Sequence, residues 1–164
     1  MTCRNIRDVE MTAWGSILIE FKPILVFIKR KLEDFQSSKL YSFEEFVDEE
    51  YRSKKGVLQY CGAYVIYEGD EPIYVGSAGK GKHHLRYRIG DLFHDYKSKT
   101  GERKYYHTLT RKLLHKYKRF NSLDEVRDFY MTKCKIRIIK TDTIRQARII
   151  EAILIYTLNP RYND

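Results

Sequence analysis

Cysteine is scarce in this sequence, and no two of its cysteines have a metal-binding spacing. The 164 residues include only Cys3, Cys61 and Cys134. An odd number of widely separated cysteines, without a CxxC pair, argues against a disulfide framework and against a zinc site. Scarce cysteine also favours a reducing compartment. Because the N-terminus lacks the charged-then-apolar layout of a secretory signal, we expect a cytoplasmic protein.

Long apolar runs are missing as well. The longest run, ILVFI at residues 24–28, is followed directly by three charged residues, whereas a membrane span needs about 18 or more predominantly apolar residues. We therefore expect no membrane span, and we find no internal repeat or low-complexity tract. The hydrophobic fraction of 43% is sufficient for a globular core. The length fits one domain, or one domain with an extension.

The positive charge is concentrated in one part of the chain. The net charge is +9, but residues 1–59 contain 10 basic and 10 acidic residues, so the excess lies in residues 60–164. Residues 80–119 alone contain 13 basic and three acidic residues, together with all five histidines and five of the 14 tyrosines. Cations neutralise phosphates and aromatic rings stack on bases, so this composition predicts a nucleic-acid partner. The alternative is an ordinary solvated surface on a basic protein.

Periodic patterns and capping residues predict an α+β fold. In chain order, we expect a helix from Pro23 to about Phe35, a short helix after Ser42, a hairpin within 62–76, helices over 85–96, over 109–117 and from Ser122, a strand over 134–140 and a closing helix over 143–158. These elements predict a small three-stranded, mainly antiparallel sheet flanked by helices over residues 60–164. Residues 1–59 then form a helical N-terminal extension with three alternative roles: packing on the main domain, forming a homodimer or helping to choose the substrate.

The expected hairpin carries tyrosines and glycines that a plain hairpin does not need. If Tyr67 pairs with Glu71 around a three-residue turn, Tyr64 lies opposite Tyr74, and both rings are on one face of the sheet. Gly76 has no side chain, so another group can approach the backbone closely there. A polar site between the two hydroxyls is one interpretation. The other, which the hairpin alone favours, is a tyrosine-rich sheet face packed under a helix.

The closing helix places a carboxylate among apolar side chains. On a helical wheel, Glu151 falls inside the arc formed by Ala147, Ile150 and Leu154. A carboxylate there is largely desolvated unless it is paired or bound to metal, and hard divalent cations take oxygen ligands of this kind. The neighbouring Arg148, at the margin of the arc, is an alternative partner. On the helix after the hairpin, Arg88 lies at the edge of the apolar stripe, where ordinary snorkelling of a long cation is the alternative to a functional role.

Taken together, these residues resemble the motifs of the GIY-YIG nuclease superfamily. Gly62–Tyr64 stands where that family has its first Gly-Ile-Tyr, and Tyr74–Gly76 stands where it has Tyr-Ile-Gly. Leu85–Arg88 matches the Leu-x-x-Arg opening of the family's first helix. Glu151 matches the metal-binding glutamate of its last helix, and Pro160–Asn163 matches its Pro-x-Tyr-Asn ending. The resemblance covers about residues 60–164, and its five short motifs occur in the family's order.

This resemblance implies a metal-dependent endonuclease that hydrolyses phosphodiester bonds, with double-stranded DNA as the expected substrate. It implies a site in which Glu151 binds Mg²⁺ or Mn²⁺ and Arg88 holds the phosphate. Tyr64 would orient or deprotonate the attacking water, Tyr74 would share its hydrogen-bond network, and Asn163 would orient or anchor neighbouring groups. The chain departs from the family at Ser77, where a lysine is usual, and at Leu92, where some members have a histidine or tyrosine. Four residues are candidates for the missing proton-transfer partner: Lys80, Lys82, His94 and Tyr96.

The expected nucleic-acid contacts come from the basic region and from the second glycine motif. They are Gly76, Lys80, Lys82, His94, Arg111, Lys112 and Lys116. The size of the chain favours a stand-alone enzyme of restriction-endonuclease or mobile-element type, with phage and repair nucleases as further possibilities. A nucleic-acid-binding module of the same fold that does not cleave is the first alternative. A structural adaptor whose basic face binds an acidic protein is the second.

Overall fold

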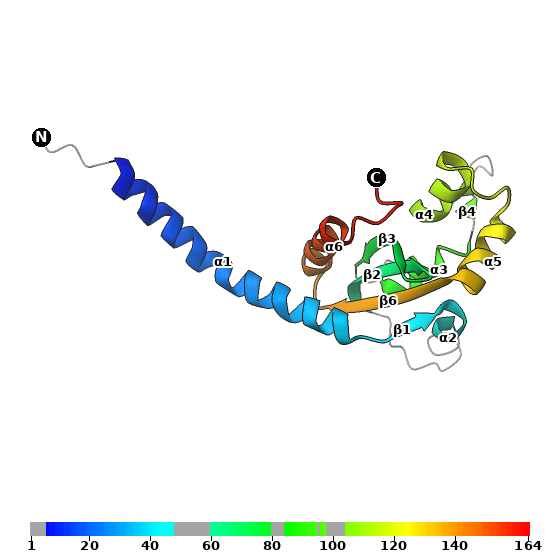
Figure 1. Cartoon of the computed structure of the whole chain (residues 1–164), viewed down its shortest axis with the longest axis horizontal. Coiled ribbons are helices and arrows are strands. Elements are labelled where there is room, and N and C mark those ends of the chain that lie inside the picture. The colour runs from blue at the N-terminus through cyan, green and yellow to red at the C-terminus, as the bar shows by residue number, and fades with distance from the viewer. Residues whose placement is uncertain (1–5, 48–59, 80–83, 95, 98–103) are drawn as a thin grey trace, which may run out of the picture. The chain divides into compact units, whose positions relative to one another are not determined.

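A computed structural model describes residues 6–47, 60–79, 84–94, 96–97 and 104–164 of the chain (Figure 1). The chain divides into two compact units, Met1–Ser37 and Ser38–Asp164, and we describe each by itself. The boundary that we expected between residues 59 and 60 differs from this division, because residues 38–47 belong to the second unit. Within the described residues, no helix is both long and apolar enough to cross a membrane.

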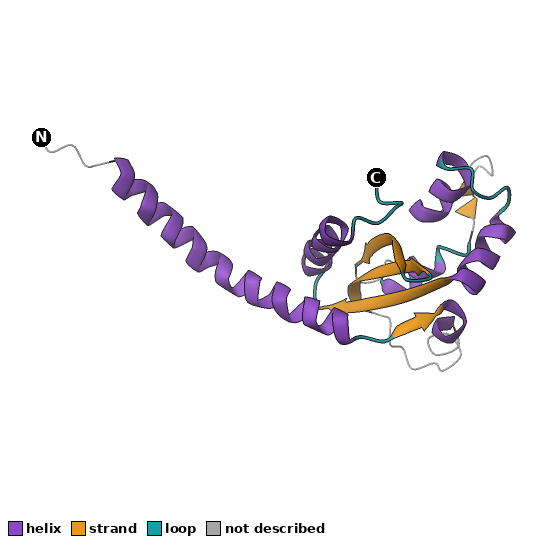
Figure 2. Cartoon of the chain, viewed as in Figure 1, coloured by secondary structure: helices purple, strands orange, loops and turns teal. Residues whose placement is uncertain are grey.

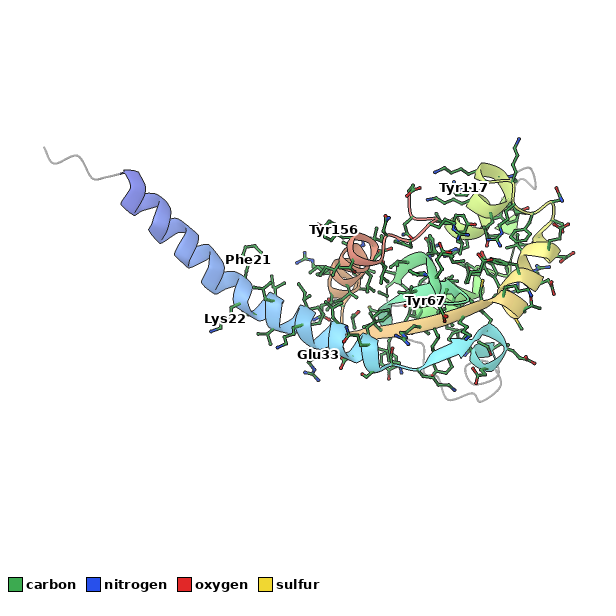
Figure 3. All side chains as sticks on the ribbon, in the orientation of Figure 1. Phe21, Lys22, Glu33, Tyr67, Tyr117 and Tyr156 are labelled. Atoms are coloured by element: carbon green, nitrogen blue, oxygen red, sulfur yellow. The ribbon has the colours of Figure 1, made fainter. Side chains whose placement is uncertain are left out.

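The first unit is a single long helix, α1, which runs from Ile6 to Ser37. It begins well before the helix that we expected from Pro23, so Pro23 lies inside it. Proline inside a helix removes one backbone hydrogen bond and costs about 3 kcal/mol or more, which is why the sequence favoured a start at this residue. Phe21 is 49% exposed, and its side chain leaves the helix on the opposite side from that of Lys22 (Figure 3).

The second unit is built on a four-stranded antiparallel sheet (Figure 2). Its strands are β1 (Leu40–Ser42), β2 (Cys61–Glu68), β3 (Glu71–Ala78) and β6 (Cys134–Thr141), in the order β1-β6-β2-β3. The expected α+β fold, an antiparallel sheet flanked by helices, is confirmed. The expected number of three strands is wrong, because β1 adds a fourth at the edge next to β6. A strand of three residues is too short to show strand alternation in the sequence.

The helices of the second unit lie mostly where periodicity and capping predicted them. They are α2 (Phe43–Val47), α3 (Leu85–Gly90), α4 (Thr108–Arg111), the π-helical turn η3 (Lys112–Lys116), α5 (Leu123–Lys133) and α6 (Ile144–Leu158). The predicted capping box of α2 is present, because Ser42 Oγ accepts from the Glu45 N–H and Glu45 Oε2 accepts from the Ser42 N–H. The helix expected to reach Tyr96 ends at Gly90, and a short strand pair follows, β4 (Tyr96–Lys97) with β5 (Lys104–Tyr105).

The β2–β3 hairpin has a tighter turn than we expected. Glu68 pairs with Glu71 around the two residues Gly69 and Asp70, and Gly69 has φ 61°, a left-handed conformation that glycine adopts without strain. Tyr67 then pairs with Pro72, but Ile66 pairs with Tyr74. Ile73 is therefore an extra residue, a β-bulge in the edge strand. As a result Tyr64 pairs with Gly76, not with Tyr74 as we expected.

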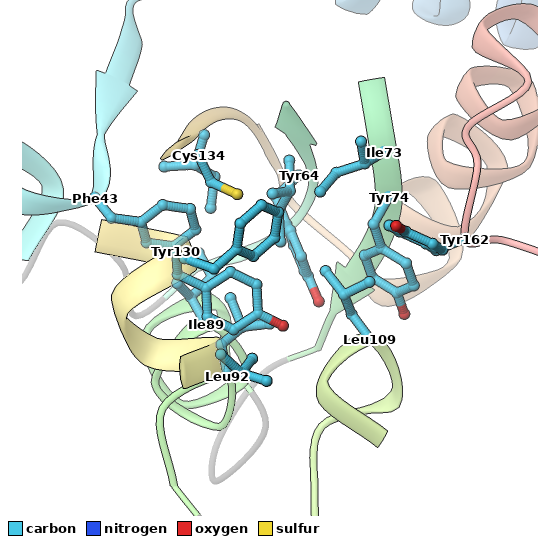
Figure 4. Close-up of a cluster of buried hydrophobic side chains, with 14 of the residues drawn as sticks. Phe43, Tyr64, Ile73, Tyr74, Ile89, Leu92, Leu109, Tyr130, Cys134 and Tyr162 are labelled. Carbon is cyan, nitrogen blue, oxygen red and sulfur yellow. The ribbon is translucent and has the colours of Figure 1, made fainter. Parts of the chain in front are cut away.

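The core lies on the face of the sheet that carries the two tyrosines (Figure 4). Tyr64, Ile66, Ile73 and Tyr74 contribute to one buried cluster with side chains of α2, α3, α4, η3 and α5. The helix α6 packs on β2 and β3, with Ala147, Ile150 and Leu154 buried. Since alternate residues of a strand point to opposite faces, the sheet is covered on both sides. The cysteines Cys61 and Cys134 are buried free thiols.

The ring of Tyr64 fills the space above Gly76. A Cβ atom built on Gly76 would lie 2.5 Å from Tyr64 Oη and 2.6 Å from its Cζ. Tyr64 is fully buried, so its ring cannot move aside cheaply. Gly76 therefore makes room for a tyrosine of the neighbouring strand, and not for a phosphate as we expected.

We predict that Gly76→Ala lowers the free energy of unfolding by about 1–3 kcal/mol, the usual cost of adding a methyl group to a well-packed core. Gly79→Ala is the matched control, because its Cβ would meet Ile144 Cδ1 at 3.5 Å, an ordinary contact distance. Urea unfolding of the two variants and the wild type gives the comparison. Equal unfolding midpoints for the two variants would contradict the packing of Tyr64 on Gly76.

Candidate active site

Four predicted site residues, from four different elements, lie in one region of the second unit. Tyr64 comes from β2, Tyr74 from β3, Arg88 from α3 and Glu151 from α6. The charges of Arg88 and Glu151 act on both tyrosines: the cation lowers and the carboxylate raises the pKa of each phenol. The tyrosine rings are 6.3 Å apart between centroids, and their hydroxyl ends point the same way (Figure 4).

Tyr64 sits at the most buried part of this region. Its side chain is 0% exposed, and its Oη lies 2.8 Å from Nε2 of His107. Burial raises the pKa of the Tyr64 phenol well above its usual range, and the nearby Tyr74 raises it further, while Arg88 opposes them. Tyr64 is therefore a neutral phenol at pH 7, able to donate and accept hydrogen bonds but not to take up a proton.

Tyr74 is nearly buried as well, and it connects the tyrosines to the arginine. Burial raises the pKa of Tyr74, whereas the positive charge of Arg88 and hydrogen bonds with Thr108 and Arg88 lower it. Arg88 itself is half-buried on α3. The guanidinium of Arg88 is therefore close enough to Tyr74 to act on that phenol.

His107 belongs to the same group, and the sequence analysis missed it. Its side chain is 2% exposed and its ring meets that of Tyr74 edge to face at 5.5 Å. Burial, and then the charge of Arg88, holds the pKa of His107 well below its ordinary value. In the sequence it was one of five histidines in a basic region, with nothing to distinguish it. The only local signal was its place directly before the helix that starts at Thr108, where its Nδ1 accepts from the Leu109 N–H.

Glu151 lies half-buried on α6. Its Oε2 accepts a hydrogen bond from Ser77 Oγ at 2.6 Å. The partner is thus a hydroxyl at the end of β3, and not the neighbouring Arg148. Ser77, which we noted only as a departure from the family, orients this carboxylate.

The donor set around Glu151 fits a hard divalent cation. The described residues contain no group of three or more histidine, cysteine or carboxylate side chains that would form a complete metal cage. A single carboxylate is nevertheless compatible with Mg²⁺, which usually keeps several waters and binds one or two carboxylates together with substrate phosphates. The hydrogen bond from Ser77 engages one carboxylate oxygen, Oε2, and so fixes the direction in which the other oxygen faces.

Asn163 anchors the end of the chain to the edge of the sheet. Its Oδ1 accepts from the Val75 N–H at 2.7 Å and its Nδ2 donates to the Val75 carbonyl at 2.8 Å. The Tyr162 N–H donates to the carbonyl of the bulge residue Ile73 at 2.9 Å. The chain end thereby pairs with the outer edge of β3, next to Tyr74. This is the anchoring role among those expected for Asn163.

The residues that we expected to contact nucleic acid differ in their exposure and in their hydrogen-bond partners. Arg111 and Lys116 are exposed, and His94 is exposed on the segment after α3. Lys112 is half-buried, and its Nζ donates to the backbone carbonyls of Tyr162 and Asp164. Gly76 lies under the Tyr64 ring, and Lys80 and Lys82 lie outside the described residues, as does the side chain of Tyr96.

A basic recess and a larger cavity lie on the α4–α5 side of the unit. The recess, of about 380 Å³, is lined by Arg111, Lys112, His115, Lys116 and Asp164. The cavity, of about 650 Å³, is lined by Tyr106, Phe120 and eight other residues of η3, α5 and the segment between them. None of the five predicted catalytic residues lines the cavity, so its size does not make it the active site.

No family model matches this chain, and neither does any curated protein. Among solved structures, the chain is similar to the crystal structure of the GIY-YIG N-terminal endonuclease domain of UvrC from Thermotoga maritima, bound to its catalytic divalent cation, magnesium. The identity is 20%, the match covers 71% of this chain and 98% of that one, and the TM-score is 0.34. A likeness of this size carries no argument about the residues or activity of this chain.

We predict that Asn163→Ala lowers the free energy of unfolding by about 1–3 kcal/mol, because it leaves two backbone groups of Val75 without their partners. Asn121→Ala, at an exposed asparagine before α5, is the control and leaves stability unchanged. Thermal or urea unfolding measures both. A variant at residue 163 with wild-type stability would contradict the anchoring role.

Proposed function

We propose that this protein is a GIY-YIG-type endonuclease that uses a divalent metal ion to hydrolyse phosphodiester bonds, with double-stranded DNA as its substrate. The observation that carries the proposal is that Arg88 and Glu151, from separate helices, both lie close enough to the two motif tyrosines for their charges to shift the pKa of each phenol. A cation, a carboxylate and two buried hydroxyls in one region are the groups that phosphodiester hydrolysis needs. We further propose a stand-alone enzyme of restriction or mobile-element type, with the activity carried by residues 60–164.

Glu151 would hold the ion, Mg²⁺ or Mn²⁺, through the carboxylate that Ser77 orients. When bound, the ion supplies Lewis-acid polarisation of the phosphate and stabilisation of the leaving oxygen. The hydrogen bond from the Ser77 hydroxyl restricts rotation of the carboxylate. Removing such a partner of a metal ligand typically lowers metal affinity or activity about 10- to 100-fold. Ser77 is thus suited to the position where the family more often has a lysine.

Arg88 would bind the scissile phosphate. A guanidinium presents several N–H donors in a fixed plane, which match the oxygens of a phosphate, and it stays charged at any physiological pH. Its hydrogen bond with Tyr74 uses only part of that donor capacity. The remaining donors would favour the transition state, in which the phosphate carries additional negative charge.

Tyr64 would orient the attacking water through its hydroxyl. Of the two roles that we expected, orientation and deprotonation, burial favours the first, because it holds the phenol in its neutral form. The hydrogen bond with His107 fixes the direction of that hydroxyl. The proton lost by water would then leave through solvent or a phosphate oxygen rather than to a tyrosinate.

The exposed cations near the basic recess would bind the DNA backbone. Arg111 and Lys116 lie at the exposed surface of consecutive helical turns, α4 and η3, and His115 lies between them. Phosphate contacts of this kind fix the position of the duplex without reading its bases. The two alternatives, a module that binds without cleaving and an adaptor for acidic proteins, both predict no metal-dependent cleavage.

We predict that Glu151→Gln leaves folding and DNA binding nearly intact but abolishes cleavage of mixed plasmid DNA in Mg²⁺. The amide can still accept from Ser77, while the charge that binds the ion is removed. We expect a fall in rate of at least about 100-fold, since removing a ligand's hydrogen-bond partner alone costs about 10- to 100-fold.

Glu44→Gln, at an exposed glutamate of α2, is the control and cleaves at the wild-type rate, and a chelator stops cleavage by both active proteins. Undiminished cleavage by the Glu151→Gln variant would contradict the metal-ligand role. Wild-type protein that binds DNA but leaves plasmids intact would favour the non-cleaving module.

We predict that the double variant Arg111→Gln/Lys116→Gln reduces the salt dependence of DNA binding. Removing one phosphate contact lowers the slope of log K against log salt by about 0.9 for duplex DNA. The pair Lys29→Gln/Lys31→Gln on α1 is the control; both lysines lie near acidic side chains, Glu33 and Asp34. Binding curves at several salt concentrations give the slope for each protein. A slope that changes only in the α1 variant would contradict the proposed DNA-binding surface at Arg111 and Lys116.

A further inference from the structure

The imidazole of His107 is held by a hydrogen bond at each ring nitrogen. Nδ1 accepts from the Leu109 N–H at 3.1 Å, as the cap of α4. A nitrogen that accepts a hydrogen bond carries no proton, so the neutral ring has its single proton on Nε2. Nε2 lies 2.8 Å from Tyr64 Oη. His107 is therefore the donor in that bond, and Tyr64 is the acceptor.

This arrangement decides where the proton of Tyr64 points. A phenol oxygen that accepts from His107 cannot also donate to it, so the Tyr64 proton is directed to another acceptor. His107 is 2% exposed and Tyr64 is 0% exposed, so bulk water does not compete for the bond between them. The two tyrosine hydroxyls point the same way (Figure 4).

We propose that His107 is a positioning residue for the nuclease reaction: its Nε2–H holds Tyr64 Oη as an acceptor, so that Tyr64 directs its own proton away from His107 and into the candidate site. The reaction in this statement rests on the proposed function. The tautomer and the direction of the bond rest on the two hydrogen bonds of the ring.

The same geometry excludes His107 as a general base. A protonated ring has N–H groups at both nitrogens, and the one at Nδ1 would face the Leu109 N–H, donor against donor. The groups around the ring are Tyr64 of β2, Tyr74 of β3 and the cation Arg88 of α3; Glu151 of α6 and Tyr130 of α5 act on Tyr64. Burial and Arg88 both lower the pKa of His107, so its proton is lost at a lower pH than that of an exposed histidine and the ring is neutral at pH 7.

The first test is the ¹⁵N NMR spectrum of the histidine side chains in the metal-free full-length protein. We expect one neutral Nε2–H imidazole that keeps its shifts between about pH 5.5 and pH 8.5, an interval that includes the ordinary histidine pKa of about 6.5. This signal is absent from the His107→Gln variant, which assigns it. An Nδ1–H tautomer, or titration of this ring within the interval, would overturn the proposal. The measurement needs no cleavage activity, so it stands even if the proposed function fails.

The second test compares His107→Leu with His107→Gln in cleavage of plasmid DNA in Mg²⁺. Leucine removes the donor, and we expect a fall in kcat of about tenfold or more with little change in KM, because a buried acceptor is left without its partner. Glutamine can still donate an N–H to Tyr64 Oη and restores part of the rate. Asn121→Leu, at an exposed asparagine before α5, is the control and cleaves at the wild-type rate.

The outcomes separate the two roles of His107. If both variants at residue 107 lose stability equally but glutamine alone regains activity, the donor function is supported over a purely structural one. If leucine keeps the wild-type kcat in a protein that cleaves DNA, or if glutamine gives no rescue over leucine, the positioning role is wrong. Urea unfolding of each variant provides the stability measurement.

Discussion

The β-bulge at Ile73 is the constraint on which the candidate site depends. If the pairing of Tyr67 with Pro72 continued without it, Tyr64 would pair with Val75, and Tyr74 would lie opposite Val65 on the other face of the sheet. One extra residue in β3 reverses this and brings both tyrosines to the same face. The carbonyl of the bulge residue Ile73 accepts a hydrogen bond from the Tyr162 N–H. A local irregularity in one edge strand thus sets the face on which the two tyrosines of the candidate site lie.

Burial determines which protonation states are favoured in the candidate site. Two phenols and an imidazole are removed from water, so their neutral forms are favoured, and the charges that act on them come from Arg88 and Glu151. Buried polar groups of this kind are stable only when they are hydrogen-bonded. The bonds between His107 and Tyr64 and between Ser77 and Glu151 therefore serve folding and orientation together. In the proposed reaction, such a site would direct donors and charges at the substrate, with little rearrangement on binding.

Local patterns in the sequence predicted much of the fold and indicated four residues of the candidate site, but not the partners of those residues. Strand alternation placed Tyr64 and Tyr74 on one face correctly, although the register was two residues off, because alternation carries no information about a bulge. The helical wheel identified Glu151 for the same reason: it depends only on neighbours in one element. His107 meets Tyr64 across 43 positions of the chain, and Ser77 meets Glu151 across 74. Contacts between distant elements leave no periodic trace.

The chain end connects the proposed DNA-binding surface to the proposed catalytic strand. Asn163 pairs with Val75 of β3, and Lys112 of η3 donates to the carbonyls of Tyr162 and Asp164 on either side of it. Arg119, just after η3, donates to the Tyr162 hydroxyl and forms an ion pair with Glu68 of β2. The exposed cations Arg111 and Lys116 are therefore carried on a helical segment that is fixed to the hairpin at several points. Because Lys112 is one of these attachments, its charge stabilises the arrangement of the two proposed surfaces, and the proposed phosphate contacts are those of its exposed neighbours Arg111 and Lys116.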